Sequence, residues 1–218
     1  MLFINKIQMN KVWVFGDSFT AEINNKDWWG KLYIEYKGYI PKVYCDFIAE
    51  EFKMETRNMA LGGMDNYSIF QRLCNNIDNI NDGDIVIVGW GPTTRFRLFS
   101  ETDNKLLSIN SPSAIIGDDE YFFKNITNRT ISEISVNRTF PIYFEELKSW
   151  EKLITKALKN NLMFFWNWSD PSNKISYVAD NYLTICVETN NFVTDCHWAE
   201  DGHKKFAQEV CDILKKGM

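Results

Sequence analysis

Residues 12–18 read VWVFGDS, an apolar run that ends in a glycine, an aspartate and a serine. A short apolar run closed by a glycine is typical of a strand buried in a parallel sheet. The glycine permits a tight turn after the strand, and that turn would bring Ser18 to the edge of the sheet. Because Asp17 and Ser18 are also favoured at a helix N-cap, an ordinary structural role is an equal alternative for this motif alone.

Outward from this stretch, short apolar runs alternate with longer amphipathic segments, the pattern of a parallel sheet covered by helices on both faces. We expect strands at 11–15, 55–58, 85–90, 162–168 and 183–187. We expect helices at 43–52, 68–76, 144–159 and 201–216. With right-handed crossovers these elements predict a three-layer α/β/α sandwich of flavodoxin-like type with about five parallel strands.

Length and composition favour one domain over residues 1–218, since 45% of the residues are hydrophobic and 24% charged. The stretch 92–141 is different, because it is rich in Asn, Ser and Thr and has only weak periodicity. An insertion of this length is usually a functional loop or partly disordered, and this one has room for a small hairpin.

Charge and cysteine usage limit the partners and the compartment. The net charge of −5, with dispersed basic residues, argues against a nucleic-acid partner. No apolar stretch is long enough for a membrane helix, and residues 1–6 do not resemble a signal peptide. The five cysteines form no C-x-x-C pair, which favours free thiols in a reducing compartment. We therefore expect a cytoplasmic protein that binds neither nucleic acid nor membrane.

Residues 195–203, DCHWAEDGH, hold both histidines of the chain. Histidine is the natural base for a serine nucleophile near neutral pH, so His197 would take the Ser18 proton and Asp195 would orient the ring. We expect His203 to pack on the start of the last helix. A metal site of Asp195, His197 and His203 is a weaker alternative, and a Cys196–His197 pair is weaker still because neighbours on an extended segment point to opposite sides.

Two more segments follow predicted strands and would lie at the same edge, where ligands bind in such sheets. In 58–66, NMALGGMDN, the glycines let the backbone approach a ligand, so an amide there, or the side chain of Asn58 or Asn66, would stabilise an oxyanion. In 89–95, GWGPTTR, Trp90 and Arg95 would line a substrate pocket, together with Trp166. The alternatives are a simple turn for the first segment, and a core tryptophan with a surface arginine for the second.

Taken together, the four segments resemble the SGNH (GDSL) hydrolase family. GDS at 16–18 resembles its block I, 58–66 its block II, and 195–203 its terminal block. The resemblance implies Ser18 as nucleophile, His197 as base, Asp195 as the orienting acid, and the amides of Ser18 and Gly63 as oxyanion donors. It covers nearly the whole chain.

The chain departs from the family pattern at two places. Block III usually reads Gly-x-Asn-Asp, whereas Gly-Trp-Gly-Pro at 89–92 lacks the asparagine that completes the oxyanion hole. Thr93, Thr94, Arg95 and Asn66 are the candidates to replace that donor. The terminal block usually reads Asp-x-x-His, but this chain has Asp-x-His, with Thr194 at the usual acid position.

The resemblance implies a serine esterase that forms an acyl-enzyme and needs no metal or cofactor. We expect a short acyl group. Tryptophans at predicted strand ends (Trp90, Trp166 and Trp168), together with the polar insertion, favour a polar substrate such as an O-acetylated sugar. The alternatives are an acyltransferase with the same triad, a non-catalytic carbohydrate-binding or assembly protein on the same fold, and, less favoured, a flavodoxin-like nucleotide binder. Sequence alone does not separate hydrolase from transferase, nor does it give the oligomeric state.

Overall fold

The computed structural model describes residues 10–24, 26, 30–31, 34–35, 38–91, 95–100, 105–109, 140–167, 184–187, 193–198 and 200–217. Within 96–100, 105–109, 140–144, 184–187 and 193–198 it describes the backbone alone.

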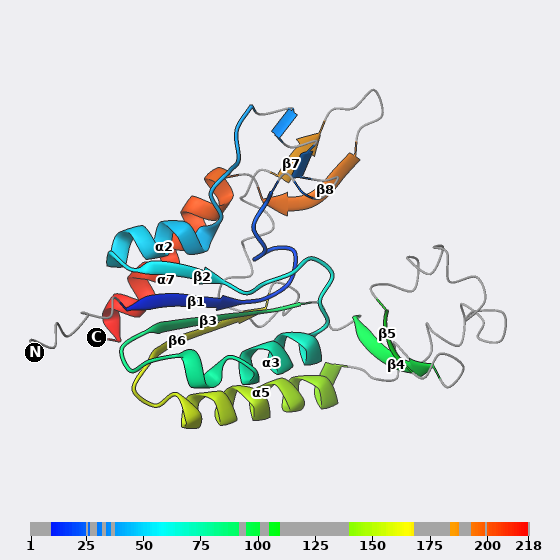
Figure 1. Cartoon of the computed structure of the whole chain (residues 1–218), viewed down its shortest axis with the longest axis vertical. Helices are drawn as coiled ribbons and strands as arrows, with labels where there is room; N and C mark the ends of the chain where they lie inside the picture. The colour runs from blue at the N-terminus through cyan, green and yellow to red at the C-terminus, as the bar shows by residue number, and fades with distance from the viewer. Residues whose placement is uncertain are drawn as a thin grey trace, which may run out of the picture.

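A parallel four-stranded sheet forms the centre of the fold, in the order β2-β1-β3-β6 (Figure 1). Its strands are β1 (Lys11–Phe15), β2 (Glu55–Asn58), β3 (Ile85–Trp90) and β6 (Leu162–Asn167). The expected α/β architecture is therefore confirmed. The fifth expected strand, β7 (Thr184–Val187), instead pairs antiparallel with β8 (Val193–Trp198) in a separate two-stranded sheet.

Helices cover both faces of the sheet, which makes three layers (Figure 1). One face carries α2 (Tyr44–Phe52) and α7 (Glu200–Lys216), and the other carries α3 (Asn66–Cys74) and α5 (Phe140–Ala157). A short 3₁₀ helix, η1 (Ile77–Asn79), follows α3. Inside 92–141, β4 (Phe96–Ser100) and β5 (Lys105–Ile109) form the small antiparallel hairpin for which the sequence has room. Among the described residues, no helix combines the length and the apolar character needed to cross a membrane.

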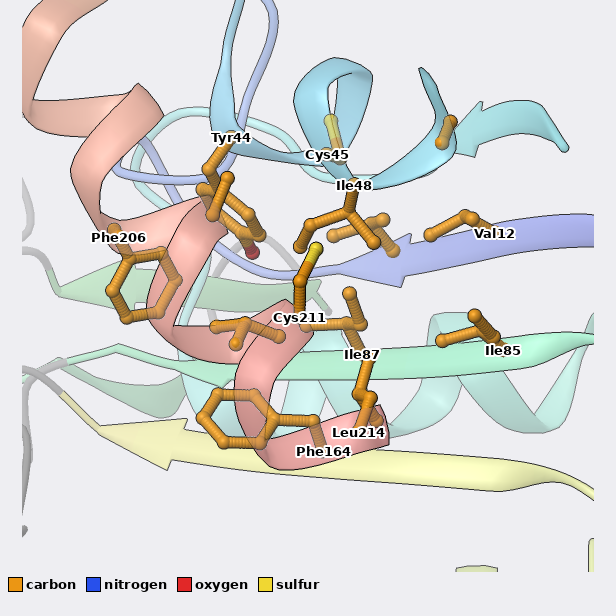
Figure 2. Packing of buried hydrophobic residues seen from close by; sticks show 14 of the residues in the cluster. Val12, Tyr44, Cys45, Ile48, Ile85, Ile87, Phe164, Phe206, Cys211 and Leu214 are labelled. Carbon is orange, nitrogen blue, oxygen red and sulfur yellow. The ribbon is translucent and has the colours of Figure 1, made fainter. Parts of the chain in front are cut away.

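The sheet divides the apolar side chains into two cores, because successive strand residues face opposite sides. Val12 and Val14 of β1 pack towards α2 and α7, whereas Trp13 and Phe15 pack towards α3 and α5. Figure 2 shows the first core, in which β1, β3 and β6 meet the two helices through Val12, Ile48, Ile87, Phe164, Phe206 and Leu214. All six residues of β3 are buried, as expected for a strand covered on both faces.

A buried carboxylate fixes the amino ends of the strands, opposite the edge that carries Ser18. Asp84 is 1% exposed. Its Oδ1 accepts from the Lys11 amide at 2.8 Å, and its Oδ2 accepts from Trp13 Nε1 at 2.9 Å and the Asn81 amide at 3.0 Å. One side chain thus joins the start of β1 to the turn that precedes β3.

Replacing Asp84 with alanine is expected to lower the free energy of unfolding by about 3 kcal/mol, because three donors lose their acceptor. Urea denaturation followed by circular dichroism measures the loss. Asp78→Ala is the matched control, since Asp78 is exposed on η1. Equal stability of the two variants would show that the Asp84 contacts do not stabilise the fold.

Candidate active site

The turn that carries Ser18 begins where β1 meets its neighbour β3. Gly16 has no room for a side chain, because a Cβ there would lie 2.4 Å from Thr20 Oγ1 and 3.1 Å from the Gly89 carbonyl oxygen. The glycine after β1 therefore permits a close approach between the turn and β3.

Asp17 binds the amides that follow Ser18. Its Oδ1 accepts from the Phe19 amide at 3.0 Å, and its carbonyl oxygen accepts from the amides of Thr20 at 3.0 Å and Ala21 at 2.9 Å. Ser18 itself is half-buried. Within the described residues, neither its hydroxyl nor its amide makes a hydrogen bond. The turn thus uses its other donors and leaves those of Ser18 available.

The loop after β2 lies against this turn. The Leu61 amide donates to the Gly16 carbonyl at 3.2 Å, and a Cβ on Gly62 would lie 3.9 Å from the Ser18 Cβ. Gly63 has a φ of 75°, in the region that favours glycine, and its amide donates no hydrogen bond within the described part of the chain. Unused amides at positions 18 and 63 therefore belong to two loops that touch.

The two asparagines of the second segment join loops together. Asn58 Nδ2 donates to the Thr20 carbonyl at 2.7 Å and to Cys45 Sγ at 3.3 Å, while its Oδ1 accepts from the Ala60 amide at 3.0 Å. Asn66 is buried, accepts from the Gly91 amide at 2.6 Å and donates to the Gly91 carbonyl at 3.0 Å. Both side chains therefore bridge loops: Asn58 Nδ2 uses both of its hydrogens in these contacts, and Asn66 Nδ2 uses one. The role of Asn66 as an oxyanion donor stays a prediction.

Arg95, the residue expected in a substrate pocket or on the surface, forms an ion pair with Asp17. Its Nη1 lies 2.7 Å from Asp17 Oδ2, and the two side chains are 15% and 1% exposed. The Arg95 Nε is buried and has no hydrogen-bond partner among the described residues. Sequence reasoning missed this pairing because the two residues are 78 positions apart.

The prediction that Trp90 and Trp166 line a substrate pocket is wrong. Trp90 is 1% exposed, donates from Nε1 to Glu151 Oε1 at 2.8 Å, and packs beside Trp150 in the core under α5. Trp166 is 3% exposed and packs against Phe206 in the opposite core. Because β3 and β6 are covered on both faces, their large side chains enter the helix layers.

A buried hydrogen bond between Tyr44 and Thr20 fixes the turn that carries Ser18, and the sequence did not predict it. Thr20 is fully buried, and its Oγ1 accepts a hydrogen bond from the Tyr44 hydroxyl at 3.1 Å. Burial raises the pKa of Tyr44, so the phenol keeps its proton and donates.

His203 is 4% exposed and stacks on the Tyr44 ring with centroids 6.1 Å apart, which confirms the expected packing at the start of α7.

Asp195 and His197 lie within β8, whose backbone alone is described. We expected them beyond the end of a parallel strand, but the structure places them inside a strand that pairs antiparallel with β7. Their side chains lie outside the described residues, as do Thr93, Thr94 and Trp168, so their roles stay predictions. In the described part of the chain, no three side chains of the His, Cys, Asp and Glu types form a metal cluster.

Replacing Gly89 with alanine is expected to destabilise the fold by about 2 kcal/mol and to displace the turn. The new Cβ would lie 2.8 Å from Thr20 Oγ1 and 2.8 Å from Trp166 Nε1, both in packed surroundings. Gly62→Ala is the control, because among the described residues its Cβ would meet Ser18 Cβ alone, at 3.9 Å. A thermal melt compares the two, and equal melting temperatures would contradict the close approach at Gly89.

Comparison with known proteins gives only distant likenesses, all of them to solved structures. No protein-family model matches the chain, and no curated protein matches it. The chain is similar to a solved structure described as a "putative lipolytic protein of G-D-S-L family" from Desulfitobacterium hafniense DCB-2, with 14% identity over 94% of this chain and 99% of that one. The TM-score of 0.39 is too low to transfer a family or an activity to this chain.

Proposed function

We propose that this protein is a serine hydrolase of the esterase type, with Ser18 as its nucleophile. One observation carries the proposal: Ser18 is half-buried and lies beside the loop that contains Gly63, and within the described residues neither the Ser18 hydroxyl nor the Gly63 amide makes a hydrogen bond. A nucleophile next to donors for the developing negative charge is what acyl transfer requires.

In this proposal Ser18 Oγ attacks the ester carbonyl while His197 accepts the hydroxyl proton. Asp195 orients the imidazole and stabilises its charged form. The amides of Ser18 and Gly63 hold the oxyanion of the tetrahedral intermediate. The alcohol leaves with the proton from His197, and water then hydrolyses the acyl-enzyme with His197 again as base.

The proposed substrate is a short-chain ester, and the alcohol portion stays open. The preference for a carbohydrate rested on tryptophans at strand ends, and two of those, Trp90 and Trp166, are core residues. A panel of short p-nitrophenyl esters and acetylated sugars tests the range. The same panel with added acceptor alcohols separates a hydrolase from an acyltransferase, which would give the transferred ester as product.

Labelling with a fluorophosphonate, followed by peptide mapping, tests the nucleophile directly. This reagent phosphonylates serines that are activated by a neighbouring base. We expect the adduct on the peptide that contains Ser18. An intact, folded protein that stays unlabelled, or one labelled at another serine, would contradict the proposal and favour a non-catalytic binding protein.

A further inference from the structure

We propose that Arg95 is a positioning residue for Ser18 and acts through the Asp17 carboxylate. The inference rests on the proposed function of Ser18 and adds to it a residue of the 92–141 insertion. It follows from the two oxygens of Asp17, which bind different parts of the molecule.

Asp17 connects the Ser18 turn to the insertion. Its Oδ1 accepts from the Phe19 amide at 3.0 Å, and its Oδ2 accepts from Arg95 Nη1 at 2.7 Å. Asp17 is 1% exposed, and a carboxylate buried to this degree is costly unless charged or polar groups stabilise it, as the Arg95 guanidinium does here. Arg95 therefore holds the Asp17 carboxylate in place, and Asp17 in turn holds the Phe19 amide, which is next to Ser18 in the chain.

Gly91, just after β3, lies close to the same carboxylate. A Cβ on Gly91 would lie 3.2 Å from Asp17 Oδ2 and 3.2 Å from the Met64 carbonyl oxygen, so the Gly91 backbone passes close to the carboxylate. Asn66 binds both the amide and the carbonyl of Gly91. Asp17 of the turn after β1 thus lies close to Gly91 and Arg95, which follow β3, and Asn66 holds Gly91 beside it.

Losing Arg95 is therefore expected to lower the reactivity of Ser18 as well as the stability of the turn. A displacement of about 1 Å at a reacting group can reduce a rate about 100-fold. The rate constant for fluorophosphonate labelling at Ser18 should fall by about that factor in Arg95→Met. Lysine keeps the charge but lacks the rigid planar fork, so Arg95→Lys should recover part of the rate.

A double-mutant cycle tests whether the effect passes through Asp17. The variants are Arg95→Met, Asp17→Asn and the double variant. If Arg95 acts through Asp17, each single variant slows labelling and the double variant is no slower than the worse single one. Wild-type labelling in Arg95→Met, or two effects that multiply in the double variant, would overturn the proposal.

Two controls separate positioning from general stability. Arg57→Met removes an exposed arginine from its pair with Glu55, and we expect the wild-type labelling rate. Asp84→Ala destabilises the far end of the sheet, and below its melting temperature it should also label at the wild-type rate. If Arg95→Met does not fold, Arg95→Gln replaces it, and a wild-type labelling rate in that variant overturns the proposal.

Amide hydrogen exchange tests the positioning independently of Ser18 chemistry. The amides of residues 19–21 donate to Asp17, so they should exchange slowly in the wild type and faster in Arg95→Met. Equal exchange in both proteins overturns the role of Arg95 whether or not Ser18 reacts. Faster exchange in a protein whose Ser18 is never labelled would contradict the proposed function and leave the positioning role supported.

Discussion

Replacing Ser18 with alanine is expected to reduce short-chain ester hydrolysis by at least about 1,000-fold and to leave the fold intact. The rate falls because no covalent acyl-enzyme can form without the hydroxyl. The fold survives because the Ser18 hydroxyl makes no hydrogen bond within the described residues, so its removal leaves no buried group unpaired.

Initial rates on p-nitrophenyl acetate, with circular dichroism and a thermal melt, measure both parts of this prediction. Ser149→Ala is the matched control, because Ser149 is exposed on α5 and its Oγ donates only to the Glu145 carbonyl, at 2.7 Å. We expect wild-type rates for that control. Full activity of Ser18→Ala would exclude Ser18 as nucleophile, and a large fall in melting temperature would assign it a structural role.

Local sequence pattern predicts the elements of this fold well, because the signals are short-range. The apolar runs at 12–15 and 85–88 can be buried on both sides only in a covered sheet, and they form β1 and β3. The strand near 184 was expected in the parallel sheet, but β7 pairs with β8. An apolar run predicts a strand, but it does not predict which other strand that strand will pair with.

The site is harder to predict, because its contacts join segments that are far apart in sequence. Trp90 at a strand end gives the same local pattern whether it enters the core or lines a pocket, and here it enters the core. Tyr44 carries no local signal for its bond to Thr20, 24 residues away. Glycines gave the better signal, since Gly16 and Gly63 follow predicted strands and both shape the turns around Ser18.

Replacing His203 with alanine is expected to lower stability, whereas replacing His197 with alanine is expected to lower activity. His203→Ala should lower the free energy of unfolding by about 2–4 kcal/mol, because His203 is 4% exposed and its ring stacks on Tyr44. At low temperature, where that variant is folded, fluorophosphonate should still label Ser18.

His197→Ala should instead reduce hydrolysis by about 1,000-fold or more, because Ser18 loses the base that activates it. Wild-type activity should rise with pH through about 6.5, the ordinary histidine value, as neutral imidazole becomes available. The residual activity of His197→Ala should lack that rise.

Rates across pH 5–8 and urea denaturation, run on both variants, distinguish the two roles. Since these are the only histidines in the chain, a rise near pH 6.5 that persists in His197→Ala and disappears in folded His203→Ala would transfer the role of base to His203. His203 stacks on Tyr44, whose hydroxyl donates to Thr20 in the Ser18 turn. That outcome would therefore place the base on α7. A profile without any rise near pH 6.5 in the wild type would instead contradict a histidine base altogether.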